Sequence, residues 1–140
     1  MTPDLLLENL QHAFNTHDID ALIACFADDY VSEQPVYPDR AFQGREQVRK
    51  NWSSNFIEMP DFNSSLVSSA IAGDLIWTEW HWKGTRQNHS TLEMRGVILF
   101  QTVAGKIKSA KLYMEPLKTG GSGIEAAVKE IMQGKQAGNA

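Results

Sequence analysis

A carboxylate and an imidazole stand two residues apart in the stretch Leu75–Lys83, and they are the strongest chemical signal in the chain. The stretch is rich in apolar and β-favouring residues, which predicts a strand. Alternate residues of a strand share a face, so Glu79 and His81 lie side by side with Trp77 next to them. A histidine beside an ionised carboxylate is held in one tautomer, and such a pair can move protons near neutral pH.

The other face of this strand is the more continuous apolar one, formed by Ile76, Thr78, Trp80 and Trp82. Large apolar side chains usually mark the inside of a domain, so periodicity alone predicts that Glu79 and His81 point outward. A second interpretation stays open, in which the two tryptophans of this face contact a partner subunit and the polar pair points inward. Aromatic residues are common at subunit interfaces.

The composition fits one globular domain. The chain has 140 residues, 42% of them hydrophobic, which is enough for a sizeable core. A net charge of -4 leaves no basic excess for a phosphate backbone, so we expect no nucleic-acid partner. The longest apolar runs are too short for a membrane span, and the N-terminus does not resemble a secretory signal. Cys25 is the single cysteine, which indicates a reducing compartment and predicts a cytoplasmic protein with a buried, inert thiol.

The first part of the chain predicts helices. Thr2 and Pro3 form a helix start, and apolar residues at helical spacing predict a helix over Pro3–Thr16. Asp18 caps a second helix, whose apolar stripe is Ile19, Leu22, Ile23 and Phe26. A short strand over residues 30–34 and a loop over 35–43 follow. Gly44 then opens a third helix, which ends at Met59 and Pro60.

From Phe62 onward the pattern changes to strands with period two. We predict four strands, over 62–72, 75–83, 91–103 and 106–117, joined by short turns. Short connections make them an antiparallel meander, so the fold class is α+β with three helices packed on one face of a curved sheet. Residues 1–117 form the domain, and 118–140 form a flexible linker with a short helix around residues 124–131 and a frayed end over Gly134–Ala140.

Several motifs resemble one family in order and position. They are Asp28-Asp29-Tyr30-Val31 with Glu33-Gln34-Pro35, Gly44-Arg45-Glu46-Gln47-Val48, Pro60-Asp61-Phe62, Trp80 with Gly84-Thr85, Arg95-Gly96-Val97 through Phe100, and Ala104-Gly105-Lys106-Ile107. Over about residues 4–117 the chain resembles the NTF2-like superfamily and its SnoaL-like branch, which includes polyketide cyclases, limonene-epoxide hydrolases and ketosteroid isomerase relatives. The resemblance implies a cone-shaped, mostly antiparallel sheet around an apolar pocket, and a homodimer through the other sheet face.

The same resemblance implies a site. Aligned without gaps to the limonene-epoxide hydrolase pattern, Glu79, His81 and Glu33 fall at pocket positions, so this register turns the Glu79/His81 face into the cone. Leu112 falls where those hydrolases keep an acid, which argues against epoxide hydrolysis. We expect the pocket wall to include Trp52, Phe56, Trp77, Leu112 and Met114.

The leading hypothesis is therefore metal-free acid–base chemistry without a cofactor, of isomerase, cyclase or dehydratase type, on a small hydrophobic carbonyl compound. His81 is the expected general acid/base, and Glu79 and Glu33 orient it or share its proton. The alternative is a non-catalytic ligand-binding or assembly domain of the same fold. The two tyrosines Tyr30 and Tyr113 are candidate donors to a developing enolate oxygen, but alternation places them opposite the expected pocket residues Glu33 and Leu112.

Overall fold

The computed structural model describes residues 2–134, and the frayed end predicted for the last residues falls mostly outside this range. Helix α1 spans Pro3–Thr16 as predicted. The Thr2 hydroxyl caps it by accepting a hydrogen bond from the backbone N–H of Leu5 at 3.2 Å. His17 ends it in the left-handed conformation, at φ 55°.

Helix α2 is shorter than predicted. It covers Ile19–Ala24 and begins at the Asp18 cap, whose carboxylate accepts from the N–H of Ala21 at 3.0 Å. Phe26 does not belong to its apolar stripe, because strand β1 already starts there and runs over Phe26–Glu33. The correction has a packing reason: the Phe26 ring meets the ring of Tyr30 at a centroid distance of 4.7 Å along β1.

The predicted loop after β1 contains regular structure. A short 3₁₀ helix covers Pro38–Arg40, and a two-residue strand β2, Phe42–Gln43, pairs with β1 in antiparallel fashion. Gly44 precedes helix α3 (Arg45–Glu58) at φ 95°, a conformation that glycine adopts without strain. Helix α3 ends where the sequence predicts.

The four-stranded antiparallel meander is confirmed. It consists of β3 (Asn63–Ala72), β4 (Leu75–Thr85), β5 (Thr91–Val103) and β6 (Lys106–Pro116). The spatial order of the sheet is β2-β1-β6-β5-β4-β3. β1 runs parallel to β6, so β1 and β6 bring residues from the start and the end of the domain side by side.

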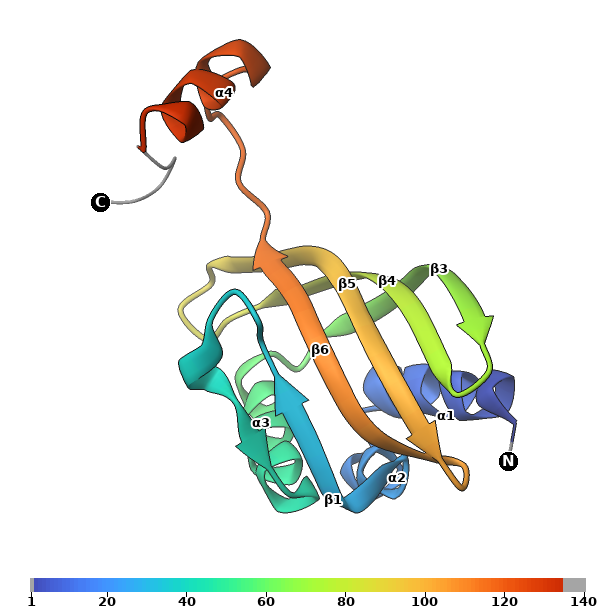
Figure 1. The fold of residues 1–140 in the computed structure, drawn as a ribbon. Helices are drawn as coiled ribbons and strands as arrows, with labels where there is room; N and C mark the ends of the chain where they lie inside the picture. The colour runs from blue at the N-terminus through green and yellow to red at the C-terminus, as the bar shows by residue number, and fades with distance from the viewer. Residues whose placement is uncertain (1, 135–140) are drawn as a thin grey trace.

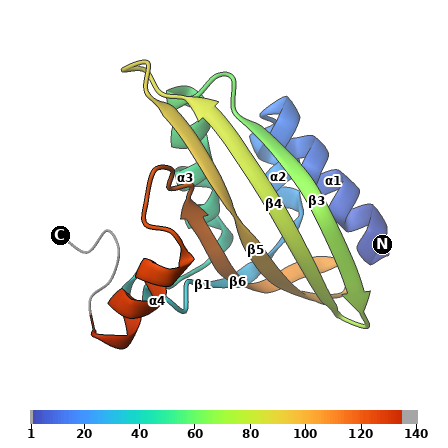
Figure 2. The same ribbon diagram turned by 90° about the horizontal axis from the view of Figure 1, so that it is seen from above.

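The sheet is twisted, and helices α1, α2 and α3 all lie on one side of it (Figure 1 and Figure 2). Strand β4 shows how the two faces differ: Ile76, Thr78, Trp80 and Trp82 are buried toward the helices, whereas Trp77 and Glu79 are exposed on the other side. We call the helix-covered side the inner face and the opposite side the outer face.

Helix α4 (Ile124–Met132) follows a glycine-rich connection and stands apart from the domain (Figure 1). None of its residues is buried, and the side chains of Ile124 and Met132 are 81% and 78% exposed. In the range 2–134 we find no helix with the length and apolarity that crossing a membrane requires.

Candidate functional site

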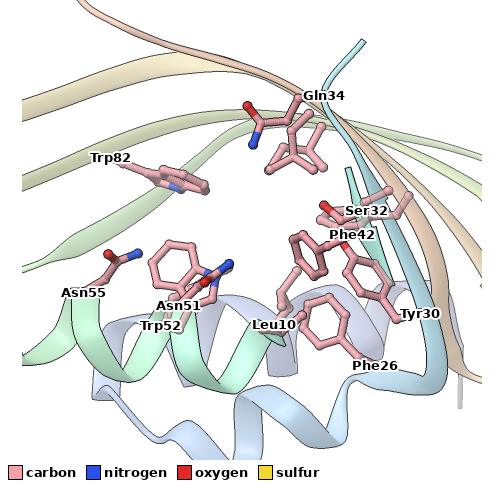
Figure 3. A pocket seen from close by; sticks show the side chains of 16 residues that line it. Leu10, Phe26, Tyr30, Ser32, Gln34, Phe42, Asn51, Trp52, Asn55 and Trp82 are labelled. Carbon is pink, nitrogen blue, oxygen red and sulfur yellow. The ribbon is translucent and has the colours of Figure 1, made fainter. Parts of the chain in front are cut away.

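A cavity of about 180 Å³ lies between the inner face of the sheet and helices α1 and α3 (Figure 3). Its lining combines apolar residues of the core with a small set of polar ones. The residues that line it are Leu10, Phe14, Phe26, Tyr30, Ser32, Gln34, Phe42, Val48, Asn51, Trp52, Asn55, Trp82, Ile98, Phe100, Ala110 and Leu112.

Aromatic rings in mutual contact build one side of this cavity. Trp52 of α3 lies 4.7 Å from the ring of Phe14 and 5.4 Å from that of Trp82, measured between centroids, and the second contact is edge-to-face. Edge-to-face pairs add stability beyond the area they bury. Since α1, α3 and β4 each contribute one ring, the wall is fixed by three separate elements.

Strand β1 and Gln34, the residue directly after it, supply three polar groups. Tyr30, Ser32 and Gln34 alternate along this stretch and therefore point to the same inner face. The first two are buried, and Gln34 is half-buried near the end of the strand. Burial raises the pKa of the Tyr30 hydroxyl to about 12, although a hydrogen bond with Ser32 opposes the shift. Tyr30 is thus a neutral hydrogen-bonding group at physiological pH.

Helix α3 and strand β4 supply the other polar groups. Asn51 and Asn55 are one helical turn apart, so both project from the same side of α3 into the cavity. Nε1 of Trp82 is buried and has no hydrogen-bond partner among residues 2–134, whereas Nε1 of Trp80 on the same face donates to the hydroxyl of Thr78 at 2.6 Å. Buried N–H groups without a partner are rare and costly.

The lining carries no formal charge. Among the residues that the structure describes, those around the cavity include no Asp, Glu, His, Lys or Arg. A charged group without a partner is expensive to bury in such surroundings. The cavity is therefore suited to a neutral, largely apolar molecule that forms a few hydrogen bonds.

Glu79 and His81 lie outside this cavity. Both project from the outer face of β4, where Glu79 accepts a hydrogen bond from the hydroxyl of Ser68 at 2.9 Å and His81 pairs with Glu93 at 2.6 Å. Glu33 is exposed on β1, opposite Lys111 in the parallel register with β6. The orientation implied by the family register is therefore wrong, and periodicity alone gave the right face. The structure does not bring the three residues together in the cone.

The predicted wall residues divide into two groups. Trp52 and Leu112 line the cavity as expected. Phe56 and Met114 are buried in the core without reaching it, and the Phe56 ring stacks on His17 at a centroid distance of 4.4 Å. Trp77 is 50% exposed on the outer face, on the same side of β4 as Glu79. The prediction that Trp77 faces the pocket is wrong, because it depended on the same family register as the orientation of Glu79 and His81.

The cavity lining includes Gln34, Asn51 and Asn55, which were not among the predicted site residues. It also includes Tyr30, a candidate hydrogen-bond donor that was expected to face away from the pocket. For β1 a signal existed, because alternation puts Tyr30 and Gln34 on one face and Glu33 on the other. For α3 the i, i+4 spacing of the two asparagines next to Trp52 was the available signal.

Two further features bear on chemistry. In the part of the chain that the structure describes, no group of three His, Cys, Asp or Glu residues is placed to hold a metal ion. Cys25 is buried, and burial raises the pKa of its thiol to about 11, which fits the inert thiol predicted from the sequence.

Solved structures with similar folds share little sequence with this chain. IdmH of Streptomyces antibioticus, a proposed polyketide cyclase, is 20% identical with a TM-score of 0.71 and covers 82% of this chain and 93% of its own. SalBIII, an epoxide hydrolase/cyclase-like enzyme of pyran ring formation in salinomycin, is 19% identical with a TM-score of 0.70 over 80% and 89%. Rv0760c of Mycobacterium tuberculosis, solved with estradiol-17beta-hemisuccinate, is 19% identical with a TM-score of 0.67 over 78% and 90%.

At these identities the similarity shows the fold alone, and no curated protein matches the chain significantly. A family model gives the stronger evidence, because the model of the SnoaL-like domain matches residues 7–110. That match runs from α1 into β6 and includes most residues of the cavity. The chain therefore belongs to the family of SnoaL-like domains, with the NTF2-like fold.

Proposed function

We propose that this protein binds a small, neutral and largely apolar molecule in the cavity between the sheet and α3. The observation that carries the proposal is the composition of the lining, in which aromatic and aliphatic walls surround neutral hydrogen-bonding groups such as Tyr30, Ser32 and Asn55. Concave, mostly apolar sites with a few convergent polar groups are the usual form of small-molecule sites.

A matched pair of compounds tests whether the cavity prefers a neutral ligand to a charged one. Phenylacetamide and phenylacetate have nearly the same shape, and only the second is charged at neutral pH. We expect phenylacetamide to bind at least about tenfold more tightly, since desolvating the carboxylate costs more than about 1.4 kcal/mol. Nuclear magnetic resonance titration of the tryptophan indole signals reports binding, because Trp52 and Trp82 line the cavity.

Variants locate the binding event. Leu112→Trp fills the cavity and should abolish binding, whereas Trp77→Ala, on the outer face, should leave it unchanged. Tighter binding of phenylacetate, or equal binding to wild type and the filled variant, would contradict the proposal.

A second candidate is an enzyme of isomerase, cyclase or dehydratase type acting on a carbonyl compound in the same cavity. Tyr30 favours it, because a buried neutral hydroxyl can donate to an oxygen on which negative charge develops. The enzyme hypothesis gains no support from Glu33, Glu79 and His81, because these residues do not line the cavity. If the protein only binds its ligand, a ketone such as acetophenone should exchange its methyl protons in D₂O buffer no faster with the protein than without it. Faster exchange that is lost in Tyr30→Phe would favour the enzyme.

We also propose a homodimer through the outer face of the sheet. Support comes from apolar side chains left exposed there, since Trp77, Leu75 and Tyr113 are 50%, 43% and 39% exposed. Sedimentation equilibrium should find a dimer for the wild type and a monomer for Trp77→Lys. A monomeric wild type at micromolar concentration would refute this part of the proposal.

A further inference from the structure

Two side-chain amides at the cavity have their oxygen atoms already occupied. Oε1 of Gln34 accepts a hydrogen bond from Nη1 of Arg40 at 3.1 Å. Oδ1 of Asn51 accepts one from Nε2 of Gln47 at 2.8 Å. These contacts fix which end of each amide faces inward, and the NH₂ groups remain to donate. Figure 3 shows the nitrogen atoms of Gln34 and Asn51 turned toward the cavity from two different sides.

The two amides come from different elements. Gln34 follows the end of β1, and Asn51 is in the middle of α3. Both belong to the lining of the one cavity, so their donors face the same space. A carbonyl oxygen has two lone pairs and can accept from two N–H donors at once, whereas a hydrocarbon can accept from neither. Gln34 is half-buried and Asn51 is exposed, so each hydrogen bond to a ligand contributes its net value only.

The size of the cavity limits what can carry that oxygen. An apolar protein cavity of about 150 Å³ is known to hold benzene. The cavity here measures about 180 Å³, which is room for one six-membered ring with a few further atoms. Its walls have little freedom to retreat, because Trp52, Trp82 and Phe14 are held in mutual ring contact.

From these observations we infer that the ligand is a neutral, single-ring carbonyl compound whose oxygen is bound by the side-chain amides of Gln34 and Asn51. The inference rests on the proposed function, because it assigns a ligand class and an orientation within the same cavity. Arg40 and Gln47 act as positioning residues: each holds an amide oxygen away from the cavity and so keeps its N–H groups directed at the ligand.

Acetophenone and ethylbenzene test the role of the carbonyl oxygen, since they share the ring and nearly the same shape. Calorimetric titration of the full chain should show acetophenone binding about tenfold more tightly, the ratio expected from two net hydrogen bonds to its oxygen. Estrone carries a ketone on four fused rings and should bind more weakly than acetophenone. Equal affinity for acetophenone and ethylbenzene, or tighter binding of estrone, would overturn the inference while the proposed function stands. If neither acetophenone nor ethylbenzene binds, the inference and the proposed function are both overturned.

Variants of the two amides test the assignment of the donors. Gln34→Glu and Asn51→Asp keep the shape but replace the NH₂ group by an oxygen, so each should reduce acetophenone affinity about tenfold. Ethylbenzene affinity should change by less than about twofold, which also shows that the cavity has stayed folded. Glu33→Gln makes the reverse change on the opposite face of β1 and should alter neither affinity.

The positioning residues give an independent readout. Gln47→Ala frees the oxygen of Asn51, and Arg40→Ala frees that of Gln34, so either amide can then turn its oxygen inward. Each variant should lower the ratio of acetophenone to ethylbenzene affinity without lowering ethylbenzene affinity. An unchanged ratio in all four variants would show that the carbonyl oxygen binds elsewhere.

Discussion

Nε2 of His81 lies 2.6 Å from Oε2 of Glu93, and both side chains project from the outer face of the sheet. This hydrogen bond is the main reason why the pKa of the Glu93 carboxyl lies below its usual range. The pair spans β4 and β5, whose residues His81 and Arg95 are directly opposite, so Glu93 is reached diagonally. The sheet itself separates this pair from the cavity.

His81→Gln is therefore expected to leave binding of phenylacetamide within about twofold of wild type. The residue touches a neighbouring strand and not the cavity, so its loss removes a contact from the outer face alone. Glu79→Gln should behave in the same way. Calorimetric titration checks both variants, and a loss of tenfold or more in either would place the binding site on the outer face.

Thr78→Val is expected to cost about 2 kcal/mol of unfolding free energy, within the range for a buried polar group that loses its partner. The Thr78 hydroxyl accepts from Nε1 of Trp80 and donates to the carbonyl oxygen of Ile98, both at 2.6 Å. Valine has the same shape and supplies neither bond. Urea unfolding measures the change, and Thr91→Val at an exposed strand position is the matched control. Equal, small losses in both variants would contradict the role of the Thr78 hydroxyl.

The face of β4 shows how far sequence reasoning reached. Alternation along Leu75–Lys83 was sufficient to place Trp80 and Trp82 inside, because removing two indoles from water outweighs most alternatives. The family register reversed this correct result. Side chains of a strand alternate with period two, so a register that differs by one residue exchanges its two faces. The order of helices and strands along the chain does not depend on this register, so it still predicted the fold correctly.

Other features could not be predicted because they depend on contacts between distant segments. Strand β2 has two residues and exists through its pairing with β1. The boundary between α2 and β1 was misplaced because Phe26 fits both the helical stripe and the strand. The donor orientation of Gln34 depends on Arg40 across a turn, and that contact requires the 3₁₀ helix that the sequence did not reveal.

The raised pKa of Tyr30 predicts that the unfolding free energy falls at alkaline pH. Burial raises its pKa from 10.0 to about 12, so folding favours the neutral hydroxyl. Its contribution is complete below pH 10 and disappears as the pH rises through 10 to 12, where the unfolded chain ionises first. A shift of this size corresponds to about 3 kcal/mol of unfolding free energy.

Urea unfolding on both sides of this window measures the loss, and Tyr30→Phe should reduce it. The thiol of Cys25 titrates in an overlapping range, since its pKa is raised to about 11, so the comparison is made in a Cys25→Ala background. A pH dependence that is the same with tyrosine and phenylalanine at position 30 would show that Tyr30 does not titrate with unfolding.

A chain ending at Leu117 is expected to keep the unfolding free energy of the longer chain within about 0.5 kcal/mol. The reason is that α4 contributes no buried residue, and the connection before it is rich in glycine. Urea unfolding of both chains at several protein concentrations provides the measurement. A clear loss that grows on dilution would show that α4 stabilises an assembly.

Gly96→Ala is expected to be the most damaging small substitution in the sheet. Gly96 on β5 lies between Trp80 of β4 and Met114 of β6 in the register. A Cβ atom there would lie 2.1 Å from the backbone oxygen of Tyr113 and 2.8 Å from Cα of Met114. Backbone atoms of a central strand cannot move aside without breaking the pairing of β5 with β6, so we expect a loss of about 3 kcal/mol or more.

Gly84→Ala is the matched control for this substitution, because Gly84 is also a glycine within a strand of the same sheet. Its added Cβ would meet Sδ of Met59 at 2.8 Å. The thioether is flexible and can turn away, so the loss of unfolding free energy should be clearly smaller than for Gly96→Ala. Urea unfolding of the two variants decides the point. Equal losses would mean that β6 shifts to accept the methyl group at position 96, and that the close approach of β5 and β6 there is adjustable.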